Sequence, residues 1–134
     1  MPTLNCELLP VAALRGTAVV ILRGAIDPRS VEILAAELGS AKGKAFHTLV
    51  LNLGDVRYIN SAGLSFLVNL SDALHLKGGG LLLANPQPKV KVVFDLMGVA
   101  QFFRIYKSVD AAVAAVSAAR RAASPRPALA RGRR

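Results

Sequence analysis

Residues 49–64 have the sequence LVLNLGDVRYINSAGL and carry the clearest structural signal in this chain of 134 residues. They start within an apolar run from Thr48 to Leu53, broken only by Asn52, which is typical of a strand covered on both faces. A polar turn is predicted next, and Ser61 then opens a helix that extends to about Leu76. A hydroxyl group is thereby placed at a helix N-terminus, where free backbone N–H groups and the helix dipole favour an added negative charge.

A serine at the start of a helix has two interpretations. Ser61 could be the N-cap, which would stabilise the helix by about 1 kcal/mol. It could also be a phosphorylation site, since a phosphate adds about −1.5 to −2 charges. The helix terminus would tolerate that charge, but a partner packed over the same turn would have to desolvate or repel it. The residues alone leave both interpretations open.

Four further strands are predicted along the chain. Residues 17–23 are rich in β-branched side chains, and residues 81–84 and 102–106 form short apolar runs. Residues 8–14 are interpreted as a short, irregular edge strand. The glycines Gly78, Gly79 and Gly80 follow a helix and precede a strand. They are interpreted as a turn, because a phosphate-binding glycine loop has the opposite order.

Three further helices are predicted from capping signals and apolar spacing. Asp27 is expected to cap the first, with Pro28 at its first position. The next follows the turn at residues 85–88 and ends at Gly98, a natural left-handed cap. Ser108 is expected to cap the last. Their predicted buried faces are Val31, Leu34, Ala35 and Leu38; Val90, Val93, Phe94 and Met97; and Val109, Ala112, Val113 and Val116.

Alternating strands and helices predict one α/β domain over residues 1–121. Its mixed, mostly parallel sheet would have four or five strands, with about four helices. Residues 122–134 are rich in proline and arginine, lack periodicity and are expected to be a disordered basic tail. Six of the 17 basic residues lie between Arg120 and Arg134, which leaves 11 basic against 8 acidic residues elsewhere. The net charge of +9 therefore belongs mainly to the C-terminal end, and it is not interpreted as a nucleic-acid-binding surface.

Several classes of site are not expected. No apolar run approaches the ~20 residues of a membrane span, and no secretory signal is recognised at the N-terminus. Cys6 is the one cysteine, which excludes an internal disulfide and fits a cytoplasmic protein. His47 and His75 lie far apart in the sequence, without neighbours at ligand spacing. Neither a metal site, nor a cofactor, nor a catalytic triad is therefore predicted.

Three segments together carry a family resemblance. Residues 51–64 resemble the signature of the STAS domain, the fold of bacterial anti-sigma-factor antagonists. Residues 22–27, LRGAID, resemble the family's strand that ends in Gly-x-Leu/Ile-Asp, and residues 93–99, VFDLMGV, resemble its third-helix motif. The resemblance covers roughly residues 10–118. The sequence differs from the commonest family pattern at Asn60, where an aspartate is frequent, and at Ala62, where a second serine is frequent.

The resemblance implies a regulatory binding protein without catalytic activity. The partner would be an anti-sigma factor with serine-kinase activity and a histidine-kinase-like ATPase fold. Its capture would release a sigma factor, phosphorylation of Ser61 would end the interaction, and a serine phosphatase would reset it. Two other roles stay open: a scaffold subunit of a STAS-based signalling assembly, and a soluble accessory subunit of a membrane transporter. The oligomeric state is not predicted.

The resemblance also implies which residues meet the partner. Asp27 is expected near Ser61 at the ends of neighbouring strands, and Asn52 and Asp55 are expected to order the loop before the helix. Gly63 is expected to allow close packing in the first helical turn. The expected partner-binding residues are Asp27, Arg57, Tyr58, Asn60, Ser61, Ala62, Gly63 and Leu64.

Overall fold

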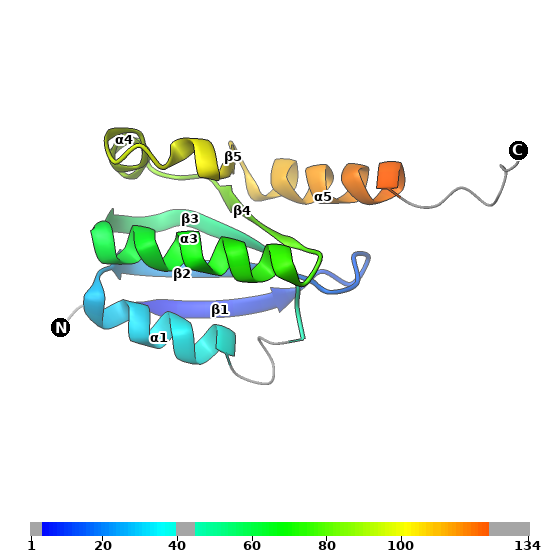
Figure 1. The fold of residues 1–134 in the computed structure, drawn as a ribbon, viewed down its shortest axis with the longest axis horizontal. Coiled ribbons are helices and arrows are strands. Elements are labelled where there is room, and N and C mark those ends of the chain that lie inside the picture. The colour runs from blue at the N-terminus through cyan, green and yellow to red at the C-terminus, as the bar shows by residue number, and fades with distance from the viewer. Residues whose placement is uncertain (1–3, 40–44, 124–134) are drawn as a thin grey trace, which may run out of the picture.

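The protein folds as a five-stranded sheet with helices on both faces (Figure 1). The computed structural model describes residues 4–39 and 45–123. The strands lie in the order β1-β2-β3-β4-β5. The strands are β1 (Asn5–Pro10), β2 (Thr17–Ile26), β3 (Thr48–Ile59), β4 (Gly80–Ala84) and β5 (Arg104–Tyr106). The helices are α1 (Pro28–Gly39), α3 (Ser61–Leu76), α4 (Pro88–Leu96), the 3₁₀ turn η1 (Ala100–Phe102) and α5 (Val109–Ala123).

The sheet is mixed, as the sequence predicts. β1 runs antiparallel to β2, and the pairs β2–β3, β3–β4 and β4–β5 are parallel. Within the described residues there are four α-helices besides η1, which matches the predicted number. α5 includes Ala122 and Ala123, and the rest of the predicted tail lies outside the described residues.

Alternation along β3 and β4 divides the core between the two faces of the sheet. Leu49, Leu51 and Leu53 pack in a cluster with buried residues of α1, α3 and α4. Val50 and Leu82 point the other way and pack in a second cluster with residues of α5. A strand buried on both faces has to be apolar at successive positions, and this explains the apolar run at the start of β3.

Several predicted strand boundaries are wrong. The first strand occupies Asn5–Pro10 rather than residues 8–14, because it pairs with β2 from Asn5↔Arg23 to Pro10↔Ala18. The last strand starts at Arg104 because η1 takes up Phe102. The largest difference is in β3, which does not stop at Leu53 but continues to Ile59.

The continuation of β3 replaces the predicted polar turn. Beyond Asn52 the pairing of β2 with β3 continues through two irregularities and ends at Ile26↔Ile59. Val56 and Ile59 are buried in the cluster that contains residues of α1, α3 and α4, whereas Arg57 and Tyr58 are exposed. The polar residues of this segment therefore lie on a strand with one solvated face.

The predicted buried faces of the helices are mostly correct. Leu34, Val90 and Phe94 are buried, as are Ala112 and Val116 of α5. Two positions differ: Ala35 is exposed, and Met97 is half-exposed because α4 ends at Leu96 and the chain turns at Gly98, where φ is +70°.

The entry into β4 depends on a glycine at position 79. A Cβ atom at Gly79 would lie 1.7 Å from the His47 carbonyl oxygen, which accepts a hydrogen bond from the Gly80 N–H at 3.0 Å. The start of β3 would have to move to make room. A Cβ atom at Gly80 would meet no atom within 4 Å.

We predict that Gly79→Ala lowers the free energy of unfolding by about 1–3 kcal/mol, the usual range for forced overpacking. The matched variant Gly80→Ala should change it by no more than about 0.5 kcal/mol. Urea unfolding followed by circular dichroism measures both. Equal effects of the two substitutions would contradict this account of the β3–β4 junction.

Candidate functional site

The start of α3 is fixed by Asn60 rather than by Ser61. The Asn60 Oδ1 accepts a hydrogen bond from the Gly63 N–H at 3.0 Å, and the Asn60 carbonyl accepts from the Leu64 N–H at 2.9 Å. Asn60 has an extended backbone, as an N-cap requires. The interpretation of Ser61 as the N-cap is therefore wrong, and Ser61 is the first residue of the helix.

The Ser61 side chain therefore takes no part in capping the helix. It is exposed, and its hydroxyl makes no hydrogen bond to any residue in the described part of the chain. The first-turn N–H groups and the positive end of the helix dipole lie beside it. Because a separate residue caps the helix, a group attached to the Ser61 hydroxyl would not remove the capping bond.

The structure brings Asp27 to the same edge of the sheet as Ser61. Ile26 and Ile59 are paired at the ends of β2 and β3, and the Asn60 N–H donates to the Ile26 carbonyl at 3.1 Å. Asp27 and Asn60 each follow one of the paired isoleucines, so α1 and α3 begin side by side. The predicted proximity of Asp27 and Ser61 follows from this pairing.

Asp27 caps α1 as the sequence predicts. Its Oδ1 accepts hydrogen bonds from the backbone N–H groups of Ser30 and Arg29, each at 3.0 Å. The buried Ser30 hydroxyl donates to the Ala25 carbonyl at 2.7 Å and ties the first turn of α1 back to β2. The Ser30 N–H, followed by the Arg29 N–H and charge, lowers the pKa of the Asp27 carboxyl below its ordinary value.

Gly63 permits the close approach of α3 to the end of β2. A Cβ atom there would lie 2.6 Å from Ile26 Cγ2, and 2.9 Å from both the Ile26 carbonyl oxygen and Ile59 Cγ1. The expected close packing at Gly63 is confirmed. Its neighbours Ala62 and Leu64 are half-buried and buried, so the exposed part of this turn is Ser61 itself.

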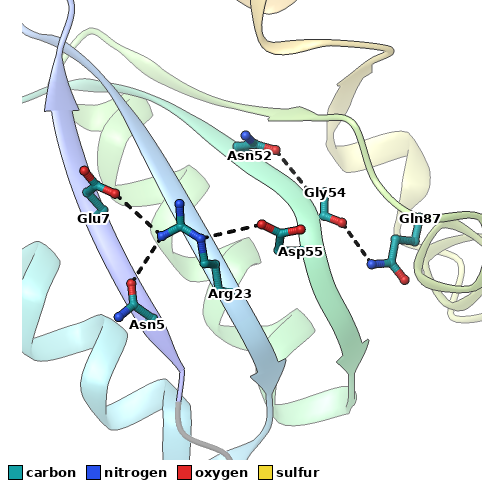
Figure 2. Close-up of polar contacts among 7 residues, drawn as sticks. All are labelled: Asn5, Glu7, Arg23, Asn52, Gly54, Asp55 and Gln87. Carbon is teal, nitrogen blue, oxygen red and sulfur yellow. Dashed lines mark hydrogen bonds and ion pairs between the residues drawn. The ribbon is translucent and has the colours of Figure 1, made fainter.

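Asn52 and Asp55 do not order a loop, because no loop is present there. Asn52 Oδ1 accepts from the Gly54 N–H at 3.0 Å within the irregular part of β3. Asp55 forms an ion pair with Arg23 at 3.6 Å, and Arg23 also contacts Glu7 at 3.5 Å, as Figure 2 shows. These exposed pairs are worth at most about 1 kcal/mol each, so they support the register more than the stability.

The same irregularity in β3 positions the start of α4. The Gln87 Nε2 donates to the Gly54 carbonyl at 2.9 Å (Figure 2), and a Cβ atom at Gly54 would lie 2.5 Å from the Asn85 amide nitrogen. α4 is thereby held against the strand that leads to Ser61.

A groove of about 310 Å³ runs from Ser61 between α3 and the segment that follows α4. One wall is the outer face of α3, and Met97 and Val99 form the other. It is lined by Ser61, Leu64, Ser65, Val68, Asn69, Met97 and Val99. Ser65, Met97 and Val99 were not among the predicted site residues, and Met97 was expected in the buried stripe of α4. The sequence signal for the exposed position of Met97 was Gly98, because α4 ends before Met97 can face the core.

Residues 4–39 and 45–123, which the structure describes, contain no group of three histidine, cysteine or acidic residues that could hold a metal ion. They also contain no helix that is long and apolar enough to cross a membrane.

Comparison with known proteins gives consistent matches. The family model of the STAS domain matches residues 10–112. A protein of Bordetella bronchiseptica named as an anti-sigma factor antagonist, BtrV, is 34% identical over 78% of this chain and 90% of its own length. The fold also matches the murine anion transporter Slc26a9 at a TM-score of 0.67 and 21% identity, over 88% of this chain and 22% of that one.

The anti-sigma factor antagonist SpoIIAA is similar to this chain in two forms. In its unphosphorylated form it superposes at a TM-score of 0.72 with 25% identity, over 85% of this chain and 97% of SpoIIAA. In its phosphorylated form, described as a Bacillus cell fate determinant, the TM-score is 0.64 with 25% identity, over 84% of this chain and 99% of that one.

We predict that Asn60→Ala lowers the free energy of unfolding by about 1 kcal/mol, because the Gly63 N–H loses its capping acceptor. Ser61→Ala removes a hydroxyl without such a bond and should leave stability nearly unchanged. Thermal or urea unfolding of the two neighbouring variants gives the comparison. The reverse order would make Ser61 the cap and contradict the assignment.

A second prediction concerns acid stability. Because the folded state lowers the pKa of Asp27, its carboxylate stabilises the fold above the unfolded pKa of about 4, and that contribution is lost as the pH falls through the folded pKa. Asp27→Asn keeps a capping oxygen but cannot titrate. Urea midpoints measured from pH 7 down to pH 2 should fall less steeply for the variant, and identical slopes would contradict the prediction.

Proposed function

We propose that this chain, which belongs to the STAS domain family, is an anti-sigma-factor antagonist. In its unphosphorylated form it would bind an anti-sigma factor with serine-kinase activity and a histidine-kinase-like ATPase fold. The sigma factor held by that partner would then be released. The protein would act by binding rather than catalysis, and ATP would belong to the partner. Such a role places it in the cytoplasm.

The observation that carries this proposal is the separation of the helix cap from the exposed hydroxyl. Asn60 caps α3, and the Ser61 hydroxyl projects from the first turn without a hydrogen bond to the described residues. A phosphate on Ser61 would be stabilised by the helix N-terminus, so the fold should survive the modification. A partner packed over this turn would meet the new charge directly.

The immediate surroundings of Ser61 support the same role. The proposed contact surface comprises Asp27, Arg57, Tyr58 and residues 60–64, of which Arg57, Tyr58 and Ser61 are exposed. Asn60 replaces a frequent family aspartate, so it caps the helix without placing a fixed negative charge beside the acceptor hydroxyl. The change lowers the repulsion that an incoming phosphoryl group would meet. A serine phosphatase would then restore the binding form.

The proposal predicts that Ser61→Asp keeps the fold and weakens partner binding by tenfold or more, which is about 1.4 kcal/mol. Ser61→Ala should bind but escape phosphorylation. Both variants and the wild type serve as baits for affinity capture from the native lysate, with mass spectrometry as the readout. Intact-mass measurement after incubation with the captured ATPase-domain protein and ATP tests the phosphorylation.

Ala118→Asp is the matched charge control, because it adds one acidic group on an exposed position of α5, on the other face of the sheet. It should capture the same partner as the wild type. Equal capture by Ser61→Asp and the wild type would end the switch hypothesis. Recovery of transporter subunits or other STAS proteins on every bait would favour an accessory or scaffold role instead.

A further inference from the structure

A second groove lies between the C-terminal parts of α1 and α3, which cover the same face of the sheet (Figure 1). Its volume is about 360 Å³, within the usual range of roughly 300–1,000 Å³ for small-molecule sites. Its main apolar residues come from three elements: Leu38 of α1, Phe66 and Leu70 of α3, and Leu49 of β3. We name it the α1–α3 groove.

The apolar lining of the α1–α3 groove is recessed. Leu49 and Leu74 are buried, and Leu38, Phe66 and Leu70 are half-buried. Among the described residues, none of the large apolar side chains that are exposed lines this groove. A thin, flexible chain can enter such a recess, whereas the flat surface of a folded protein reaches only its rim. The groove therefore fits a small molecule better than a protein partner, which usually covers about 800 Å².

Small residues keep the groove open. Ala35 of α1 and Ala73 of α3 both line it, and both are exposed. Gly39, at the end of α1, also lines it, and a Cβ atom there would meet no atom within 4 Å. Ala35 differs from its predicted burial because it faces the groove instead of the core. Larger side chains at these positions would fill the space that a ligand needs.

A cationic group stands at one end of the groove. Lys77 follows the last residue of α3, and its Nζ donates to the Phe46 carbonyl at 3.4 Å, a long hydrogen bond. Among the described residues that line the groove none is acidic, and neither ion pair found in them involves Lys77. The Leu74 and His75 carbonyls at this helix end accept from the backbone of residues 77–79, so they are not unpaired acceptors. The Lys77 ammonium is therefore available to an anion.

We propose that the α1–α3 groove binds a small amphipathic molecule with one apolar chain and an anionic head, such as a fatty carboxylate. The chain would lie along Leu49, Phe66 and Leu70, and the carboxylate beside the Lys77 ammonium. Burial of the chain would provide most of the affinity, because an exposed ion pair contributes little.

This inference is independent of the proposed function. Lys77 lies 16 residues beyond Ser61, which corresponds to about 24 Å of helix. No residue of the contact surface proposed for the anti-sigma factor lines the α1–α3 groove. The groove would therefore be a second site, for a ligand of different chemistry.

The first test measures the binding of dodecanoate by isothermal titration calorimetry, at concentrations below micelle formation. Ala35→Leu places a larger side chain in the groove and should raise the dissociation constant about tenfold, the effect of losing contact with about two methylene groups. The matched control is Ala36→Leu, because Ala36 is also exposed on α1 but does not line the groove. The control should bind dodecanoate as the wild type does.

Ala73→Leu fills the groove from α3 and should weaken binding as Ala35→Leu does. It keeps the test decisive if one filling variant does not fold, which urea unfolding of each protein checks. Amide chemical shifts of the wild type locate the ligand: dodecanoate should shift residues 35–39, 46–49 and 66–77 and leave the amide of Ser61 unchanged.

The head group is tested separately. Lys77→Gln removes the cation and should weaken dodecanoate binding about threefold, the scale of an exposed ion pair, without changing the affinity for dodecan-1-ol. Lys89→Gln is the matched control, because Lys89 is exposed on α4 and lies outside this groove. The wild type should bind dodecyltrimethylammonium more weakly than dodecanoate. Equal affinity for the anionic and the cationic head would overturn the inference.

Three other results would also overturn it: no saturable binding of dodecanoate, equal losses in Ala35→Leu and Ala36→Leu, or shifts centred on Ser61. Sedimentation of the ligand-free proteins examines the competing occupant. Self-association of the wild type that Ala35→Leu abolishes would assign the groove to a second copy and reject the ligand. Because no anti-sigma factor is needed, failure of partner capture would reject the proposed function and leave this inference standing.

Discussion

The parallel pairing of β2 with β3 out to Ile26 and Ile59 is the constraint on which the site depends. β4 pairs with β3 only as far as Asn52, so among the described strands β2 alone pairs with the remainder of β3. That extension carries the chain to the edge where both α1 and α3 begin. The Asn60 N–H completes the pairing by donating to the Ile26 carbonyl. Because Gly63 has no side chain, α3 can lie directly against Ile26. A shorter pairing would separate Asp27 from Ser61.

Because of this geometry, Asn60 and Ser61 have separate roles at the start of α3. Asn60 satisfies the backbone donor that a helix start leaves open, and Ser61 is free of that task. An exposed hydroxyl that contributes little to stability can be modified at little cost to the fold. The polar cluster around Arg23 has a different position, on the solvated strand surface shown in Figure 2, and it contributes to register rather than to the Ser61 surface.

Much of this architecture was predictable because its signals are local. Asp27-Pro28 and Ser108 mark helix starts through bonds within a few residues of each other, and the structure has those bonds. The end of β3 was not predictable in this way. Gly54 and Asp55 are turn-forming residues in isolation, but here they belong to a strand that stays paired with β2, where Asp55 lies opposite Arg23. Non-local pairing of this kind leaves no periodic trace in a single sequence.

The candidate site was predictable in part for the same reason. Ser61 and Asp27 lie at element starts, which the sequence marks, whereas the second wall of the groove comes from a segment far along the chain. The apolar period of α4 correctly predicts Val90 and Phe94 as buried, but it cannot distinguish a core-facing methionine from one just beyond the last helical turn. Met97 shows the consequence: its apolar character contributes to the surface beside Ser61 instead of the core.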